Sequence, residues 1–543
     1  MTNRGLCRTL AFQARIYCLN VITGWRAPRK RIAALMAVSI SLAMAPACGS
    51  GSKTQTQTTP PPEIPLTRLS TDTFTNSTSQ HATEVEPDTF AFGSTIVSAF
   101  QVGRIFSGGG ADIGFATSTN GGATWTSGFL PGITSFHDGG TSTAASDAAV
   151  AFDAAHNVWI ISSLALGTQN RVLASRSSDG LTWQNPVTVT AVGSPDKDWI
   201  ACDNTAASPF FGHCYVEWDD PSANGLVWMS TSTDGGLTWG PALNTADSVQ
   251  GIGGQPVVQP NGTVIVPIED VFGSDMLAFT STDGGASWNS SVVISTIIDH
   301  LVNSAILEPL DRLRTSALPS AEVDATGVVY VVWQDCRFRT GCSSNDLVMS
   351  TSTDGLTWTA PIRIPIDAIS STADHFIPGL GVDPAASGPN AHLTLTYYWY
   401  SQANCTFATC ALNLGFVTSQ DGGSTWSAAK MIAGPMSLAW LPETFSGRMV
   451  ADYISTSYSG GKAYAAFALA RANSGAVFDE AIYTTTQPLA SSLTAAEALH
   501  LTSKNEKPVP NAKSDHGRRK FYDEDGEYPI PPRRKYLKRS AKR

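Results

Sequence analysis

The sequence predicts an all-β fold built from repeated units, and three observations carry this prediction. Six copies of a short motif, Ser-x-Asp/Asn-Gly followed by Trp, occur between Ser118 and Trp426, with successive tryptophans 49 to 70 residues apart. Runs of β-forming residues flank each copy, and the chain is rich in Gly, Ser, Thr and Trp. Repeats of this period indicate blades or solenoid units. We therefore predict a seven-bladed β-propeller, with six blades as the alternative, made of four-stranded antiparallel blades.

Each copy of the motif is expected to form a hairpin turn. The Asp side chain can accept backbone N–H bonds, the following Gly tolerates positive φ, and the Trp provides an apolar plug between neighbouring sheets. Asn replaces Asp in the first copy, and an amide can cap a turn but cannot act as an acid. A structural role is therefore predicted for the six equivalent residues Asn120, Asp179, Asp234, Asp283, Asp354 and Asp421.

The segments around each motif predict four strands per unit. In the second unit, two strand-like segments lie upstream of the motif, at 149–153 and 158–162. A third, at 171–175, comes just before the motif, and a fourth, at 186–190, follows the Trp. Four strands per unit is the composition of a propeller blade.

The last unit has no motif and only three strand-like segments, at 447–453, 463–467 and 480–484. We expect its missing outer strand to come from residues 65–70, near the start of the repeat region. Pairing of the two ends would close the ring and remove an exposed sheet edge.

The first 47 residues are predicted to be an export signal. They carry seven basic and no acidic residues, and an apolar run from Ile32 to Pro46 follows the last basic cluster. This run is too short to span a bilayer permanently. Cys48, which follows small residues, resembles the lipidated Cys of bacterial lipoprotein signals, and plain cleavage with secretion is the alternative. Either route predicts an exported protein, at the cell envelope or free outside it.

Two segments flank the predicted propeller at 66–490. Residues 48–65 are expected to be a flexible linker, and residues 491–543 a disordered charged tail. Between them the chain is strongly acidic, because residues 48–503 hold 15 basic and 39 acidic side chains. We therefore expect no nucleic-acid partner, and contact with a membrane only through the N-terminal lipid anchor. The sequence carries no signal for an oligomeric state.

Six cysteines of the repeat region fall into three close pairs, which predict three disulfides that each close one loop. No CxxC motif and no His at zinc-like spacing accompanies them, so no metal site is predicted. No cofactor is expected, and nothing indicates a structural Ca²⁺. The pairs are Cys202/Cys214, Cys336/Cys342 and Cys405/Cys410.

The motif copies resemble the Asp-box, or BNR, repeats of sialidases and related propellers, over roughly residues 66–490. Propellers of this kind include glycosidases, lyases, receptors and glycan-binding proteins. The resemblance to sialidases implies three Arg that clamp a carboxylate, a Tyr/Glu nucleophile pair and an Asp acid/base. Their Phe/Tyr-Arg-Ile-Pro motif ahead of the first box is absent, and the nearest matches are Gly103–Phe106 and, after the fifth box, Ile362–Pro365.

Ligands of propellers usually meet the loops around the central channel, where the inner strands begin. Arg448, Asp452 and Tyr453 form the most enzyme-like group there, since an activated Tyr can replace a carboxylate nucleophile. The alternative is a structural ion pair between Arg448 and Asp452. Other residues expected at the channel are Glu84, Glu86, Asp88, Asp196, Lys197, Asp198, Asp374 and His375.

Arg337 and Arg104 are further candidates for the catalytic site, because Arg binds carboxylates in a bidentate manner. For Arg337 the alternative is a simple pair with Asp335. Arg314 completes the set of arginines from which a carboxylate clamp could be built.

Together these features predict an exported, sialidase-like Asp-box propeller that recognises extracellular glycans at the cell envelope. The alternative is an exo-α-sialidase-type glycoside hydrolase that acts on terminal sugars. A second alternative is a scaffold that binds other envelope proteins.

Overall fold

The computed structural model describes residues 64–302, 311–492, 501–502, 506–514, 521–523 and 526–528, and these residues are almost entirely β-strand and connecting loop. The predicted export signal, Cys48 and residues 48–63 lie outside this part of the chain. Within it, helices are short 3-10 turns, so the all-β prediction is confirmed, and none of them is long and apolar enough to cross a membrane. These turns are η1 (Pro221–Ala223), η3 (Thr340–Cys342), η4 (Gly388–Asn390), η5 (Leu438–Trp440) and η6 (Leu489–Ser492).

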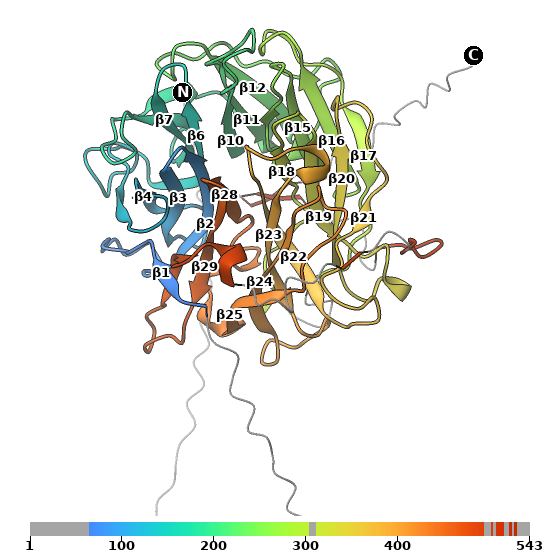
Figure 1. The fold of residues 1–543 in the computed structure, drawn as a ribbon. Coiled ribbons are helices and arrows are strands. Elements are labelled where there is room, and N and C mark those ends of the chain that lie inside the picture. The colour runs from blue at the N-terminus through green and yellow to red at the C-terminus, as the bar shows by residue number, and fades with distance from the viewer. Residues whose placement is uncertain are drawn as a thin grey trace, which may run out of the picture. The chain divides into compact units, whose positions relative to one another are not determined.

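The innermost strands contact one another in a closed ring, which is the arrangement of a β-propeller. In Figure 1, β2 and β28, from opposite ends of the chain, lie side by side. Contacts run in order through β2 (Glu84–Phe92), β6 (Ala144–Asp153), β10 (Asp196–Cys202), β14 (Val257–Val258), β18 (Ser320–Val323), β22 (Asp374–Val382) and β28 (Ser455–Ser459), and then return to β2.

The remaining strands extend outward from these inner strands in antiparallel sheets. An eight-stranded sheet joins β2, β3 (Thr95–Arg104), β4 (Gly110–Ser118), β5 (Thr126–Phe129), β6, β7 (Val158–Leu166), β8 (Arg171–Ser177) and β9 (Val187–Thr190). A three-stranded sheet holds β10, β11 (Cys214–Asp220) and β12 (Leu226–Ser232). A five-stranded sheet holds β13 (Gly251–Ile252), β14, β15 (Val264–Asp270), β16 (Asp275–Ser281) and β17 (Val292–Thr296).

Three four-stranded sheets follow. The first consists of β18, β19 (Val329–Asp335), β20 (Asp346–Ser352) and β21 (Ile362–Arg363). The second consists of β22, β23 (Leu393–Tyr400), β24 (Ala411–Ser419) and β25 (Lys430–Ser437). The third consists of β28, β29 (Lys462–Ala470), β30 (Glu480–Thr485) and β1 (Leu66–Arg68). Two-stranded pairs are formed by β26 (Glu443–Thr444) with β27 (Gly447–Arg448), and by β31 (Phe521–Asp523) with β32 (Gly526–Tyr528).

The predicted number of blades needs correction. Counted as hydrogen-bonded sheets of at least four strands, the described residues form five blades, not seven or six. Two predicted units merge because β4 pairs with β6 at Gly110 and Ala145. The next unit has only three strands, since two isolated bridges, Met229 with Leu243 and Leu226 with Gln250, stand where a fourth strand was expected.

The predicted closure of the ring is confirmed. Strand β1 pairs antiparallel with β30, with Leu66 opposite Thr485 and Arg68 opposite Tyr483. The N–H of Leu69, just beyond β1, donates to the carbonyl of Ile482 at 2.7 Å. The start of the repeat region thus provides the outer strand of its last sheet.

The Asp-box segments form the expected hairpin turns. In the third copy, Ser232 Oγ donates to Asp234 Oδ1 (2.9 Å) and accepts the N–H of Gly236 (2.9 Å). The Asp234 carboxylate in turn accepts the N–H and the hydroxyl of Thr238, at 2.9 and 2.6 Å. In the first copy Asn120 makes the same pair of contacts with Thr124, its amide nitrogen acting as the donor to the hydroxyl.

The tryptophans of these turns pack between neighbouring sheets. Trp183, from the second copy, lies in an apolar cluster with Phe115 of β4, their ring centroids 5.7 Å apart. Trp426, from the sixth copy, is 1% exposed and packs with Tyr330 and Met349 of the preceding sheet. These two turns are therefore anchored by their tryptophans to a neighbouring unit of the repeat.

All three predicted disulfides are present, which fits an extracellular protein. Cys202–Cys214 links the end of β10 to the start of β11, while the other two close short loops. These are Cys336–Cys342 and Cys405–Cys410.

Candidate functional site

Three consecutive inner strands share an irregularity that aims a charged side chain away from the regular pleat. The register of β2, β6 and β10 shifts at a bulge, and one residue in each bulge has positive φ. These residues are Glu86 (54°), Asp147 (45°) and Lys197 (49°). Positive φ is uncommon for a residue with a Cβ, and bulges re-aim side chains near functional sites.

The three re-aimed side chains meet in a buried ion cluster, which we call the channel cluster: Glu86, Asp147, Lys197, Arg314 and Asp452. Lys197 Nζ lies 3.1 Å from Glu86 Oε1, 3.1 Å from Asp147 Oδ1 and 2.7 Å from Asp452 Oδ2. Arg314 donates to the same oxygen of Asp452. The exposed fraction of these side chains is 11% or less.

Burial and pairing set the charges of the channel cluster. Burial alone would raise the pKa of Asp452, but Arg314 and Lys197 outweigh it and hold the pKa at about 2. For Glu86, burial dominates over the attraction of Lys197 and raises the pKa to about 8. Burial would lower the pKa of Lys197, yet the surrounding carboxylates keep it well above its usual range. Burial thus favours the neutral form of Glu86, while Asp452 keeps its charge beside Arg314 and Lys197.

A second layer of polar groups supports Glu86. The amide nitrogen of Gln101 donates to Glu86 and to Ser146 Oγ, the latter at 2.9 Å. Arg104 Nη1 donates to the amide oxygen of Gln101 at 2.8 Å, and the Arg104 side chain is fully buried. Arg104 is therefore connected to the channel cluster through Gln101.

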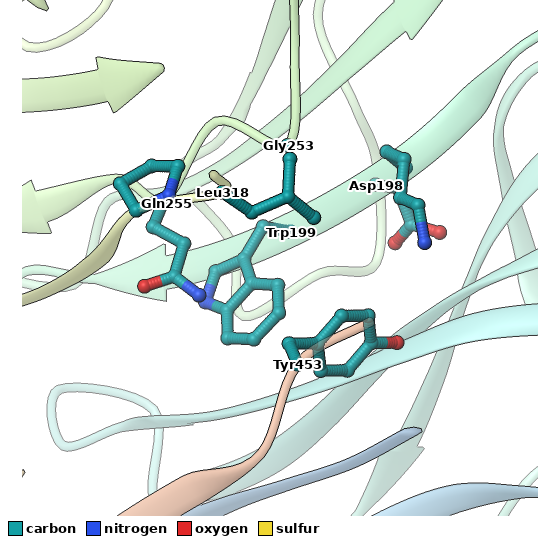
Figure 2. Close-up of a pocket in the computed structure, with 8 residues that line it drawn as sticks. Asp198, Trp199, Gly253, Gln255, Leu318 and Tyr453 are labelled. Atoms are coloured by element: carbon teal, nitrogen blue, oxygen red, sulfur yellow. The ribbon is translucent and has the colours of Figure 1, made fainter. Parts of the chain in front are cut away.

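A small pocket adjoins Lys197. Its cavity volume is about 10 Å³, roughly the space that one water molecule needs. Figure 2 shows the Tyr453 ring beside the Trp199 indole, with the Asp198 carboxylate at the other side of the pocket. The lining residues are Lys197, Asp198, Trp199, Gly253, Gln255, Leu318, Pro319 and Tyr453.

Tyr453 stands in an environment that disfavours its phenolate form. Its ring meets Trp199 edge-on at 5.0 Å, and Lys197 Nζ lies 5.4 Å from its centroid. Burial, together with Asp147 and Glu86, raises the pKa of Tyr453 well above its usual range. No hydrogen-bond partner of its hydroxyl is found among the described residues.

Two further carboxyl groups are buried nearby. Asp198 follows Lys197 in β10, and Glu217 lies in β11, opposite Trp199. Burial raises the pKa of both well above the usual range, and Asp198 adds to the effect on Glu217. Burial therefore favours the protonated form of both side chains.

The structure brings together part of the predicted site. Asp452 lies in the channel cluster with Glu86 and Lys197, and Tyr453 lines the adjoining pocket. Arg448 instead pairs with Glu443 at 2.7 Å, so the alternative of an Arg448–Asp452 pair is not what is found. The backbone of Arg448 contributes indirectly, because its carbonyl accepts the N–H of Arg314 at 2.7 Å and so helps to place Arg314.

Arg337 lies away from the channel cluster. Its guanidinium pairs with Asp335, with Nη2 2.7 Å from Oδ2 and Nε 2.9 Å from Oδ1, and it also donates to Ser295. The Arg337–Asp335 pair is the alternative that the sequence analysis gave to binding of a substrate carboxylate by Arg337.

Asp147 is the member of the channel cluster that sequence reasoning missed. It stands in the inner strand of the second unit, where Glu86 and Lys197 stand in the first and third. An acidic residue flanked on both sides by small residues, within 144–149, was the available signal.

One group of side chains has the composition of a metal site. Ligand atoms of Asp346, Asp367 and His375 lie within 4.8 Å of one another. However, Arg339 Nη2 lies 2.6 Å from Asp367 Oδ1, and Arg363 Nε lies 2.8 Å from Asp346 Oδ1. Two guanidiniums already neutralise these carboxylates, so the group is an arginine–aspartate cluster and not a cation site.

No protein-family model matches the chain, and no curated protein does. Solved structures with similarity include a Hadza microbial sialidase, 13% identical over 72% of this chain and 76% of that one, with a TM-score of 0.39. An ulvan lyase, described as a new family of polysaccharide lyase, is 11% identical over 77% and 95%, with a TM-score of 0.42. A Trypanosoma rangeli sialidase in complex with the inhibitor DANA is 11% identical over 74% and 55%, with a TM-score of 0.40. At these TM-scores the similarity carries no conclusion about the activity of this chain.

Proposed function

We propose that this chain is an exported Asp-box propeller that recognises extracellular glycans and does not hydrolyse them at its channel. One observation carries the second half of the proposal, namely that the charged residues at the channel are paired with one another and buried. The cavity volume of the adjoining pocket is about 10 Å³, roughly the space of one water molecule. Glycan recognition is supported by the resemblance of the repeats, and export by the N-terminal segment and the disulfides.

The requirements of sialidase-type hydrolysis argue in the same direction. A clamp of three Arg needs guanidiniums free to meet a substrate carboxylate, whereas Arg337 and Arg448 are paired with Asp335 and Glu443. A Tyr nucleophile needs a lowered pKa and a nearby base. The pKa of Tyr453 is raised instead. Glu86 is the carboxyl group of the channel cluster that would have to act as the base, and burial raises its pKa to about 8, which favours its neutral form.

A sialidase-type hydrolase remains the second candidate, because of one specific observation. Tyr453, Lys197 and the carboxyl group of Asp198 meet at a single pocket, although Tyr453 is distant in sequence from the other two, and such convergence is typical of an active site. In this reading Tyr453 would be the nucleophile, and Arg314 and Lys197 would bind the substrate carboxylate.

The test is a pair of assays on the purified full-length chain. A fluorogenic sialoside and a panel of other glycosides measure hydrolysis, and a glycan array measures binding. We expect binding without turnover. Turnover that disappears in Tyr453→Phe, but persists in the matched variant Tyr464→Phe outside the pocket, would establish the hydrolase instead. A folded chain that neither binds nor turns over any glycan would leave the scaffold as the remaining function.

A further inference from the structure

Part of the C-terminal tail lies against the propeller, although the sequence predicts disorder for all of it. Leu501 exchanges two backbone hydrogen bonds with Trp426, at 2.6 and 2.9 Å. Further along, Val509 donates its N–H to the carbonyl of Arg337 at 2.8 Å, and Ser514 Oγ accepts the N–H of Asp299 at 3.2 Å. Residues 506–514, which we call the tail segment, therefore follow a defined course over one part of the fold.

The tail segment meets the end of the sheets that lies opposite the Asp-box turns. Strand β20 ends at its Asp-box turn, where Ser352 hydrogen-bonds to Asp354, and it begins at Asp346. Because neighbouring strands are antiparallel, Arg363 at the end of β21 and His375 at the start of β22 lie at the same end as Asp346. This is also the end at which the inner strands begin.

At this end, the arginine–aspartate cluster holds Arg363 in a fixed orientation. Nε of Arg363 donates to Asp346 Oδ1 at 2.8 Å, and Nη2 donates to the backbone carbonyl of Asp367 at 2.8 Å. Arg339 braces both aspartates from the other side. The Arg363 side chain is fully buried, so the direction of its remaining nitrogen, Nη1, is set by the cluster.

Glu506, the first residue of the tail segment, receives that nitrogen. Arg363 Nη1 lies 3.3 Å from Glu506 Oε1 and 3.4 Å from Oε2. A guanidinium presented from a preorganised cluster is the arrangement that recognises a carboxylate.

The chemistry of the tail segment suits docking as an extended peptide. Pro508 and Pro510 flank Val509, and Pro restricts both itself and the residue before it to extended conformations. Little entropy is therefore lost when the segment docks. The segment also carries Lys507 and Lys513, and the tail from residue 504 onward holds 13 basic against six acidic residues, opposite in sign to the acidic propeller.

We propose that Arg363, oriented by Asp346, Asp367 and Arg339, is a carboxylate-binding site for an extended basic peptide that carries one glutamate, and that the tail segment of the same chain occupies it. General attraction between a basic tail and an acidic propeller brings the segment close, and Glu506 fixes its register. The proposal does not depend on the proposed function.

The test measures backbone hydrogen exchange in the full-length chain and in the variants Glu506→Gln and Lys507→Gln. Val509 supplies the only backbone N–H between residues 508 and 510, so its exchange reports directly on docking. If Glu506 fixes the segment, Glu506→Gln speeds exchange at Val509 about fivefold at low salt, and Lys507→Gln changes it much less.

If only general attraction held the segment, the pattern would reverse. Removing the negative charge of Glu506 would slow exchange, and removing the positive charge of Lys507 would speed it. Either that reversal or equal exchange in all three proteins overturns the proposal. Both substitutions lie in the tail segment, outside the apolar clusters of the propeller, so folding is not at issue. A repeat at tenfold lower protein concentration should give the same rates, whereas a loss of protection on dilution would assign the site to the tail of a second copy.

Discussion

At the scale of single residues, Glu86, Asp147 and Lys197 combine backbone strain with burial of charge. A residue with a Cβ held at positive φ costs about 1–3 kcal/mol, and such strain persists only when the surrounding structure determines it. The ion pairing that the bulges make possible supports this geometry, because Lys197 contacts three carboxylates, from β2, from β6 and from the segment before β28. The bulges thus bring these three side chains together in the channel cluster.

Two of the three acidic partners of Lys197, Asp452 and Glu86, should respond differently to neutralisation. In Asp452→Asn, two buried cations lose their shared carboxylate, and the expected loss in the free energy of unfolding at pH 7 is about 3–5 kcal/mol. Glu86 is already largely neutral at this pH, so Glu86→Gln should cost less than about 1 kcal/mol. Urea unfolding of the two variants provides the comparison. Equal losses would mean that Glu86 is ionised in the folded protein.

At the scale of elements, the Asp-box turn depends on the acceptor oxygen more than on its charge. Asn120 makes the contacts that Asp234 makes, so Asp234→Asn should change the free energy of unfolding by less than about 0.5 kcal/mol. Asp234→Ala removes the acceptor for Thr238 and should cost about 1 kcal/mol. Chemical unfolding of both variants tests this, and a larger cost for Asn than for Ala would contradict it.

The junction between β1 and β30 is a second element-scale test. Leu69→Pro removes the N–H that donates to Ile482 and a buried apolar side chain. We expect a loss of about 3 kcal/mol or more, together with faster aggregation from the exposed edge of β30. Leu69→Ile is the matched control, since it keeps the N–H and the volume. Thermal unfolding with light scattering would show the difference, and similar behaviour of the two variants would argue against closure through β1.

At the scale of the whole molecule, the buried carboxyl groups predict how stability varies with pH. Burial is the leading cause that raises the pKa of Glu84 and Asp88 to about 7, and of Glu86 and Asp112 to about 8. The folded state therefore binds more protons than the unfolded state between about pH 4 and pH 8. Their contribution to stability is full below about pH 4 and is lost as the pH rises through 7 and 8.

The Asp-box residues act with the opposite sign. Hydrogen bonds lower the pKa of Asp179 and Asp354, so their stabilisation is present above about pH 4 and is lost in more acidic solution. The two effects place the expected maximum of stability near pH 5, with a decline towards pH 8. Urea midpoints measured across this range would reveal it, and a midpoint that rises from pH 5 to pH 8 would be inconsistent with protonated buried carboxyls.

The sequence by itself determined those features that depend on local patterns. The Asp-box turns, the three disulfides and the pairing of β1 with β30 follow from turn residues, short Cys spacings and strand periodicity. These interactions join residues close in the chain, or complete a repeat whose missing part is evident. Even the inner-strand positions of Glu86, Lys197 and Asp452 could be read from the alignment of units.

Only the tertiary structure decided which of those residues meet. Lys197 and Asp452 are 255 residues apart, and their contact depends on a bulge in β10 and on the place of the last unit in the ring. Arg448 was predicted at the site because Asp452 and Tyr453 follow it closely in the sequence. In the folded ring Arg448 pairs with Glu443, and Arg314 pairs with Asp452 instead. The blade count and the docking of Glu506 on Arg363 have the same origin. They depend on how separate sheets pack and pair, and a local pattern of residues does not encode that.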